Sequence, residues 1–450
     1  MVTIKVIALI FFIFFSNYSY SAQKIQIIRD AEIELFLHKI INLTIEDNKT
    51  NYFYPRLVLN SEYNAFVTGS NKIYINTGLI NKANSLSEIQ AVLAHEIGHL
   101  TLNHFSSRLV NSKNLSNYSK LATFAGIALS VKGKLNTNSA VGLMIGSNDI
   151  AKKYSLQFSR IQEQQADKFA LDQLIKNKIS LNGFENLLIN LANEEFNNSN
   201  THTGYYRSHP FSKQRLEQVK RYKSQFQKVS FGEQSISINE NIISLRYIKN
   251  KIEAYSVNPN EIIKTLENKN NFLSSYSKMI ALFRIGKYDL AHNKFSLIKN
   301  KYDKYPFFYE LRGDIYFKEG NFSNAIIEYQ KAIQSLQEVF TPSIDLIKFS
   351  LIKTYLQTHK ITDLNKSIIL LEELLLNNPN WSYLWRLLAK ASGKLNNKGV
   401  AYIALAEEAL IKKNFIKAKK YVDLANEYPS LPLSYKIRGS DILARIKFKN

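Results

Sequence analysis

The chain of 450 residues contains no cysteine. This absence excludes a disulfide scaffold, a thiol nucleophile and any metal site with cysteine ligands. It fits an oxidising compartment, where a free thiol is a liability. Any metal centre in this chain must therefore be built from histidine, aspartate and glutamate side chains.

The sequence also lacks a hydrophobic run long enough to span a bilayer, which takes about 20 residues. An unbroken apolar run covers only the ten residues 6–15 and follows Lys5. The small residues Ser19 and Ser21 then stand where a signal peptidase reads. We predict that residues 1–21 are a cleaved secretory signal and that the mature chain is exported without a transmembrane segment. An uncleaved N-terminal anchor is the alternative.

Acidic residues are few beside basic ones, with 37 Asp and Glu against 59 Lys and Arg and a net charge of +22. A nucleic-acid partner, an anionic membrane surface and a general bias toward lysine all give such a balance. The basic residues form no block of five, and no RNP, zinc-finger or helix-turn-helix pattern accompanies them. We therefore expect no nucleic-acid partner and favour the general bias, with peripheral membrane contact as the second interpretation.

The length predicts two or three domains, and 45% hydrophobic residues allow each domain a core of its own. Apolar residues recur at helical spacing over residues 26–44, and short strands are expected at 56–60, 65–67 and 73–77. The turn at residues 69–72 makes the last two strands a hairpin.

Two long helices are predicted after the hairpin. Ser85 and Glu88 have capping-box spacing and open the first of them. The second is expected over residues 152–178. The segment 106–150 between them is less regular and holds two short apolar stretches. A lid over a cleft, a contact with a membrane surface and two ordinary packing helices all remain open for it.

A period of 34 residues appears in the C-terminal half. Large and small residues recur at this offset in the pairs Gly286–Gly320, Tyr288–Phe322, Ala291–Ala325 and Phe295–Tyr329. This offset is the length of the tetratricopeptide (TPR) repeat, and weaker copies follow toward the C-terminus. Such repeats stack into a solenoid with a concave surface for binding proteins. They imply protein partners and no chemistry.

The sharpest motif is His95-Glu96-Ile97-Gly98-His99. Residues four apart lie on one face of a helix, so both imidazoles can reach one ion. Glu96 then faces the attacking water and takes its proton. Zinc is the expected ion, because neutral imidazoles and a carboxylate suit it. A pattern this short occurs by chance, but here it lies on a capped amphipathic helix just after a hairpin.

A site with two histidines needs a third ligand. Glu163 and Asp167 on the second long helix are also four residues apart. Glu163 can complete the zinc shell, and Asp167 can hold a ligand imidazole in its metal-binding tautomer. The alternative for this pair is a solvated acidic face.

These residues resemble the HtpX-type zinc metallopeptidases. The match includes Asn64-Ala65-Phe66 and the run from Ile73 to Leu79, which fall in that family's edge-strand region, and Ser159-Arg160. The signal peptide and the TPR repeats narrow the resemblance to the BepA (YfgC) type. Those are periplasmic proteases of Gram-negative bacteria that act on outer-membrane protein assembly. The resemblance covers essentially the whole mature chain.

The resemblance implies a role for each matching residue. His95, His99 and Glu163 would bind one zinc ion per chain, Glu96 would be the general base, and Asp167 would be a nearby carboxylate that serves as proton donor. Ser208-His209-Pro210, followed by Arg215-Leu216, matches a segment whose histidine occupies the fourth zinc position and blocks water. From the residues alone, a histidine before proline is more often a turn residue.

The remaining histidines lack a partner at motif spacing, and we assign them to the surface or to packing: His38, His104, His202, His292 and His359. His104 lies five residues after His99, which places it about 140° away around a continuous helix. The departures from the family are small. Gln165 stands where an acidic residue is common, and the segment 106–150 shows no matching motif.

The sequence thus predicts an α+β zincin-like metallopeptidase domain at residues 22–231 and an all-α TPR solenoid at 272–450. A helical linker or degenerate repeat at 232–271 joins them. The predicted function is that of a periplasmic zinc endopeptidase that degrades or controls client proteins, with the TPR domain holding clients or an outer-membrane assembly machine. The alternative is a TPR chaperone or scaffold with a latent or inactive protease domain.

The substrate is expected to lie extended along a strand at the edge of the sheet. The residues predicted to bind it are Ile73, Tyr74, Ile75, Asn76 and Thr77.

Overall fold

The structure is a computed structural model. It describes residues 26–45, 53–68, 71–104, 158–197, 209, 213–226, 234–238, 241–269, 271–298, 305–336 and 341–447. The predicted signal peptide and the segment 106–150 lie outside the described residues. Among the described residues, no helix combines the length and the apolar character that crossing a membrane requires.

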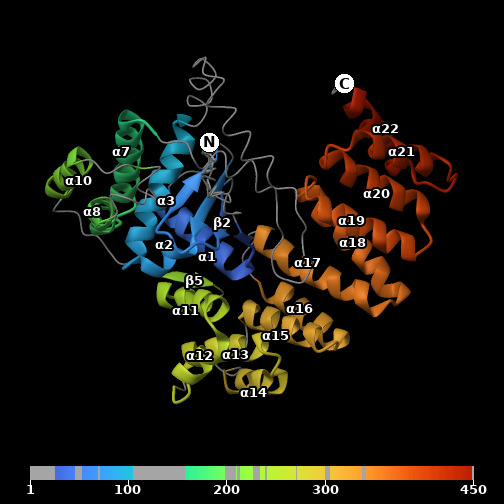
Figure 1. Ribbon diagram of the computed structural model, residues 1–450, viewed down its shortest axis with the longest axis horizontal. Coiled ribbons are helices and arrows are strands. Elements are labelled where there is room, and N and C mark those ends of the chain that lie inside the picture. The colour runs from blue at the N-terminus through green and yellow to red at the C-terminus, as the bar shows by residue number, and fades with distance from the viewer. Residues whose placement is uncertain are drawn as a thin grey trace, which may run out of the picture.

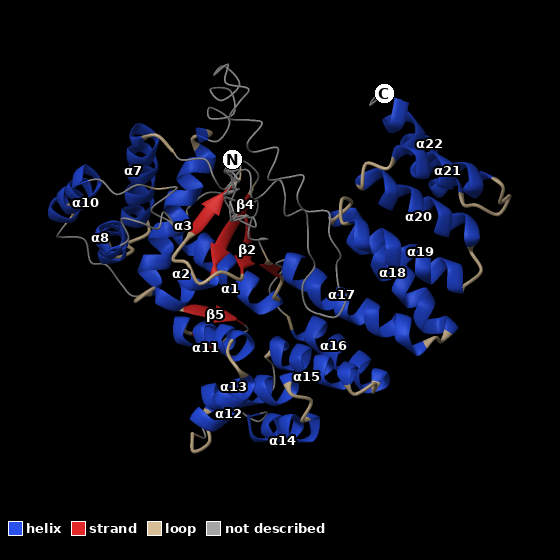
Figure 2. Ribbon diagram, viewed as in Figure 1, coloured by secondary structure: helices blue, strands red, loops and turns tan. Residues whose placement is uncertain are grey.

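The N-terminal half contains one mixed four-stranded sheet (Figure 2). Its strands are β1 (Ile27–Ile28), β2 (Tyr54–Val58), β3 (Ala65–Val67) and β4 (Lys72–Asn76), in the order β1-β2-β4-β3. β3 and β4 pair antiparallel, which confirms the predicted hairpin, whereas β2 and β4 run parallel.

The prediction that residues 73–77 form the edge of the sheet is wrong. β4 pairs with β2 on one side and with β3 on the other, so its backbone groups are already hydrogen-bonded on both sides. Thr77 is not in the strand, because it begins helix α2 (Thr77–Lys82). Of the two edge strands, β3 packs against the helix that carries the His-Glu motif.

Helices cover the sheet, and two of them begin at serine residues that cap them. They are α1 (Ala31–Thr44), α3 (Leu86–Thr101), α7 (Arg160–Lys176), α8 (Asn182–Asn197) and α10 (Lys213–Gln225). The Ser85 hydroxyl accepts from the Glu88 amide and caps α3. A full capping box of Ser159 and Gln162 begins α7, so this helix starts later than residue 152.

The segment 232–271 was predicted to be helical, but it opens with a β-hairpin. The hairpin consists of β5 (Ile236–Ile238) and β6 (Asn241–Ile243), and the helices α11 (Leu245–Ser256) and α12 (Pro259–Thr265) follow. Ile236 and Ile238 are buried while Ser237 between them is exposed. This alternation is the period of a strand and not of a helix.

The repeats appear as consecutive antiparallel helix pairs. The first two pairs are α13 (Phe272–Arg284) with α14 (Tyr288–Ile298), and α15 (Pro306–Lys318) with α16 (Phe322–Ser335). Equivalent helices start 34 residues apart, from 272 to 306 and from 288 to 322. Gly286 and Gly320 adopt φ angles of 75° and 79° in the turns, a conformation that glycine adopts without steric cost.

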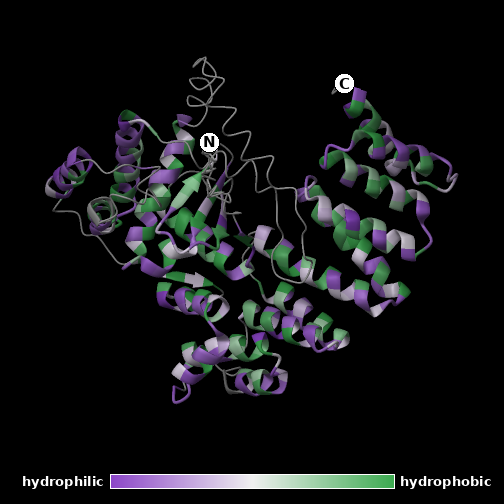
Figure 3. Ribbon diagram, viewed as in Figure 1, coloured by the Kyte–Doolittle hydropathy of each residue, from purple (hydrophilic) through white to green (hydrophobic). Residues whose placement is uncertain are grey.

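Three further pairs continue the array. They are α17 (Thr341–Thr358) with α18 (Ile361–Asn377), α19 (Ser382–Lys394) with α20 (Lys398–Ile411), and α21 (Phe415–Asn426) with α22 (Leu433–Lys447). In Figure 1 the helices curve from below the sheet to the C-terminus at the upper right, which is the shape of a TPR-like solenoid. Figure 3 shows hydrophilic and hydrophobic residues side by side along most of these helices, as expected where one face is buried.

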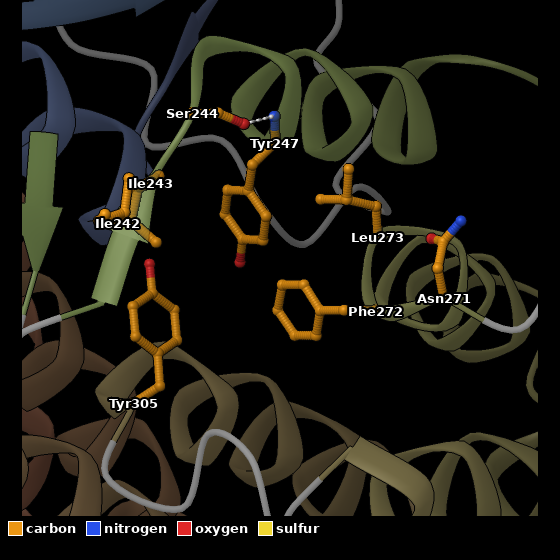
Figure 4. Close-up of a pocket in the computed structure, with 8 residues that line it drawn as sticks. All are labelled: Ile242, Ile243, Ser244, Tyr247, Asn271, Phe272, Leu273 and Tyr305. Carbon is orange, nitrogen blue, oxygen red and sulfur yellow. Dashed lines mark hydrogen bonds between the residues drawn. The ribbon is translucent and has the colours of Figure 1, made fainter. Parts of the chain in front are cut away.

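The two halves share one hydrophobic core, whose buried residues run from Ala31 to Ala404. Helix α17 packs directly on α1, and the Ser343 hydroxyl donates to the Ala31 carbonyl at 2.7 Å. A cavity of about 350 Å³ lies at the junction, where the rings of Tyr247, Phe272 and Tyr305 line it (Figure 4). None of its lining residues belongs to the candidate metal centre.

Candidate metal centre

Two helices bring the predicted site residues together. His95, Glu96 and His99 come from α3, and Glu163 comes from α7, which packs against α3. Gly98 permits this close packing, since a Cβ atom there would lie 3.2 Å from both the Cα and the carbonyl oxygen of Ala166. The close approach of α3 and α7 at Gly98 thus brings the two motifs into one site.

Four side chains converge on a single buried point. His95, His99, Glu163 and His209 each offer one ligand atom, and these atoms all lie within 4.8 Å of one another. The Nε2 atoms of His95 and His99 are 3.0 Å apart, and His95 Nε2 lies 3.1 Å from His209 Nδ1. Glu163 Oε1 lies 3.1 Å from His209 Nδ1 and 3.3 Å from His99 Nε2.

These separations fit a tetrahedral zinc ion. A tetrahedron with Zn–N and Zn–O bonds of about 2.0–2.1 Å has edges of about 3.3–3.4 Å. The separations of 3.0–3.4 Å among the imidazole nitrogens and the Glu163 carboxylate oxygens are close to those edges. A zinc ion also explains why two imidazole nitrogens face each other at 3.0 Å, because both direct their lone pairs to the metal.

A buried pair of opposite charges supports one side of the site. Asp167 Oδ1 lies 2.8 Å from His95 Nδ1, on the side of the ring away from the ligand group. The Arg215 guanidinium donates two hydrogen bonds to Asp167, at 2.6 and 2.8 Å, and its Nη1 lies 2.9 Å from Glu163 Oε2. Arg215 therefore holds both carboxylates, a role that the spacing of the sequence did not reveal.

The charges set the protonation of the two carboxylates. Burial alone would raise the pKa of Asp167, but Arg215 and the hydrogen bond with His95 lower it below its usual value. Burial would also raise the pKa of Glu163, whereas His209 and Arg215 bring it well below the usual range. Both side chains are therefore acceptors at neutral pH, as a metal ligand and its neighbour must be.

The two helix-borne histidines differ in pKa. Burial lowers the pKa of His95, but hydrogen bonds with Asp167 and Glu163 outweigh it and raise the pKa to about 9. Burial is the largest effect on His99 and lowers its pKa well below the usual value. His99 therefore presents a neutral ring at neutral pH.

His209 makes contact with both the ligand group and the candidate base. Its Nδ1 belongs to the ligand group, and its Nε2 lies 3.2 Å from Glu96 Oε1. Its side chain is completely buried. The residues alone favoured a turn for this histidine, and the segment's resemblance was the signal that pointed to the site.

The predicted substrate residues are not part of this group. Tyr74 lies on β4 and stacks on Phe66 of β3 with ring centroids 5.0 Å apart. Both residues belong to a small buried cluster of the sheet.

His104 lies outside the ligand group, although it contacts one of its members. The prediction placed it on a continuous helix, but α3 ends at Thr101 and Asn103 turns the chain with a φ of 54°. His104 Nδ1 consequently lies 3.0 Å from His99 Nδ1.

Comparison with known proteins gives one matching family and several relatives. Residues 29–223 match peptidase family M48. The beta-barrel assembly-enhancing protease of Yersinia pestis is 21% identical over 373 residues, which cover 81% of this chain and 73% of that protein. The metalloprotease YcaL of Escherichia coli is 25% identical over 186 residues, which cover 40% of this chain and 65% of that protein.

The solved structure of the APC/C hetero-tetramer Cut9-Hcn1 aligns with this chain over 82% of this chain and 86% of the other chain. Its TM-score is 0.22 at 14% identity. A likeness this weak supports no argument, so the repeat architecture rests on the helix pairs of this chain.

Proposed function

We propose that this chain is an exported zinc endopeptidase that removes client proteins during outer-membrane assembly. Residues 29–223 match peptidase family M48 and enclose a buried group of four metal ligands. The convergence of two imidazoles and a carboxylate from separate helices carries the proposal. The names of the relatives support the assembly role, since they describe proteases that enhance β-barrel assembly.

We assign the roles within the site from these contacts. His95, His99 and Glu163 hold the zinc ion, which would polarise the scissile carbonyl and lower the pKa of a water molecule to about 7. Glu96 takes the proton of the attacking water and passes it to the leaving amine. Asp167 keeps the proton of His95 on Nδ1, so that Nε2 is free to bind.

His209 makes the resting enzyme latent. Its Nδ1 occupies the fourth ligand position, where water must enter, and its Nε2 lies beside the Glu96 carboxylate. The same imidazole thus blocks both the water site and the general base. Removal of this ring from the site frees both positions at once.

The substrate strand is proposed to add to β3 instead of β4. In the part of the chain that the structure describes, β3 lies at the edge of the sheet, and it packs against α3, which carries Glu96. An extended peptide on β3 gains backbone hydrogen bonds without displacing a strand. The TPR-like helices, which share the core with the peptidase domain, would hold the client or its assembly machine beside the site.

Replacement of the general base tests the activity. Glu96→Gln should retain zinc, since the ligands are unchanged, but should lower the rate of client cleavage by about 10²–10⁴-fold. Zinc content and cleavage of an unfolded protein substrate measure the two effects. A variant that binds zinc and performs the full cellular role would favour the chaperone or scaffold function.

Replacement of His209 tests latency separately. His209→Ala should raise the rate of cleavage several-fold while zinc remains bound by three ligands. Glu96→Gln combined with His209→Ala is the control and should be inactive. A rate that stays level or falls in His209→Ala would contradict latency but leave the peptidase assignment intact.

A further inference from the structure

We propose that His104 and Gln165 are positioning residues that fix the tautomer and orientation of His99. The inference rests on the zinc site proposed above and extends it to two residues that no motif assigned. His104 Nδ1 lies 3.0 Å from His99 Nδ1, and His104 Nε2 lies 3.0 Å from Gln165 Oε1. The three side chains therefore form a row that leads away from the ligand group.

The fold holds this row in place. Helix α3 ends at Thr101, and Asn103 adopts a left-handed conformation that asparagine tolerates. The turn directs His104 back against His99, where its side chain is 4% exposed. On α7, Gln162 donates from its Nε2 to the His104 carbonyl at 3.4 Å, and Gln165 is one turn further along.

Only one arrangement of hydrogens satisfies every contact in the row. If His99 Nε2 binds zinc, the neutral ring carries its hydrogen on Nδ1 and must donate it. His104 Nδ1 is the atom within reach, so it accepts. A neutral His104 then carries its hydrogen on Nε2 and donates it to the Gln165 carbonyl oxygen. The glutamine oxygen thus favours the tautomer of His104 that accepts from His99 Nδ1.

The two helix-borne ligands are therefore held by different chemistry. His95 donates to the Asp167 carboxylate, whose charge Arg215 compensates. His99 donates to the neutral imidazole of His104. The Phe158 ring stacks on the His99 ring with centroids 3.7 Å apart. The His104–Gln165 row orients His99 without adding a further buried carboxylate to a site that already holds Glu96, Glu163 and Asp167.

Variants of equal size separate hydrogen bonding from packing. His104→Asn retains an acceptor oxygen near the position of Nδ1, whereas His104→Leu fills the same space without an acceptor. The zinc affinity of each full-length variant is measured by competition with a chelator, and thermal unfolding without metal reports on folding. Substitution of cobalt adds a spectrum that is sensitive to ligand geometry. His292→Asn and His292→Leu, far from the site in sequence and on helix α14, are the controls.

We expect His104→Leu to weaken zinc binding by about 10–100-fold. His104→Asn should recover most of this loss, and both controls should match the parent protein. Gln165→Glu retains an acceptor and should bind zinc at least as tightly as the parent, whereas Gln165→Leu should weaken binding. Equal or tighter binding by His104→Leu than by His104→Asn would show that His104 serves packing only and would overturn the inference. A parent protein that binds no zinc would instead overturn the proposed function.

Discussion

Charged side chains are buried in this chain where a partner of opposite charge lies next to them. Glu34 on α1 is fully buried and accepts from Arg29 and from Arg56, the latter at 2.8 Å. A buried carboxylate without such donors would cost several kcal/mol. His38, one turn further along α1, is also buried. Burial lowers its pKa and so favours its neutral form.

His38 should make the folded protein sensitive to acid. Burial and the neighbouring Lys39 lower its pKa to about 4 from the ordinary 6.5. Between these pH values the unfolded chain binds a proton that the folded chain excludes, so stability falls as the pH decreases through this window. We expect His38→Gln to remove roughly 1–3 kcal/mol of the loss between pH 7.5 and pH 4.5.

Urea unfolding at several pH values measures this effect. The exposed His359, whose φ of 58° suits asparagine, provides the control in His359→Asn. If His38→Gln loses as much stability on acidification as the parent protein, the acid sensitivity lies elsewhere.

The sequence alone predicted some residues of the site and missed others. The spacing of His95, His99 and Glu163 predicted side chains on two helix faces, and the structure brings those faces together. His104 and Arg215 depend on contacts that spacing does not encode. The first follows from a helix end at Thr101, and the second follows from the packing of α10 near α7.

At the scale of elements, the contact between α3 and α7 holds the metal centre together. Gly98 lies between the two ligand histidines of the motif and faces Ala166. A larger side chain there should push the helices apart, because two backbone atoms of Ala166 and the Phe169 ring on α7 would each lie 3.2 Å from its Cβ atom. Such a shift separates Glu163 from both imidazoles.

We therefore expect Gly98→Val to weaken zinc binding by at least about tenfold, since ligand positions must hold within about 0.5 Å. Chelator competition measures the affinity. A Cβ atom added at Gly393 on α19 would meet no atom within 4 Å. Gly393→Ala should therefore leave zinc binding unchanged and stabilise the protein by about 0.5–1 kcal/mol. Undiminished affinity in Gly98→Val would show that the helix contact tolerates added volume.

Local sequence signals predicted individual elements better than they predicted which elements lie next to one another. The period of 34 residues predicted α13 to α16, and the capping residues predicted the start of α3, because both signals lie within a few turns of chain. The position of β4 inside the sheet could not be predicted in the same way. Its second neighbour, β2, comes from a separate segment, and a parallel pairing leaves no turn in the sequence.

At the scale of the whole molecule, a buried ionic cluster joins the two halves. We define the junction cluster as Asp30, Glu32, Lys251, Tyr276 and Tyr305. Lys251 Nζ lies 2.7 Å from Glu32 Oε2 and 2.8 Å from Asp30 Oδ1. The Tyr276 and Tyr305 hydroxyls also donate to Glu32. Burial lowers the pKa of Lys251, but the two carboxylates outweigh it and raise the pKa well above its usual value.

The cluster links elements that are distant in the sequence. Glu32 lies on α1 beside the sheet, Lys251 lies on α11, and Tyr276 lies on the first helix of the repeats. The core around it is continuous between the halves. The peptidase domain and the first repeats should therefore unfold together as one cooperative unit, with loss of the metal site.

Lys251→Met tests this coupling, because it leaves the Glu32 charge buried with tyrosine hydroxyls as its remaining donors. We expect a loss of about 3–5 kcal/mol in the free energy of unfolding. The double variant with Glu32→Gln should lose less than the sum of the single losses, since the unpaired charge is gone. Urea unfolding, followed by circular dichroism and by zinc release, measures both quantities.

The matched control is Lys412→Met, which removes a half-exposed lysine at the C-cap of α20 from its pair with Glu408. Arg386 still donates to Glu408, so stability should change by less than about 1 kcal/mol. If Lys251→Met is as mild as this control, the cluster contributes little to the junction. If zinc release precedes the loss of helix, the two halves unfold separately, and a client held by the repeats could not affect the site through a shared core.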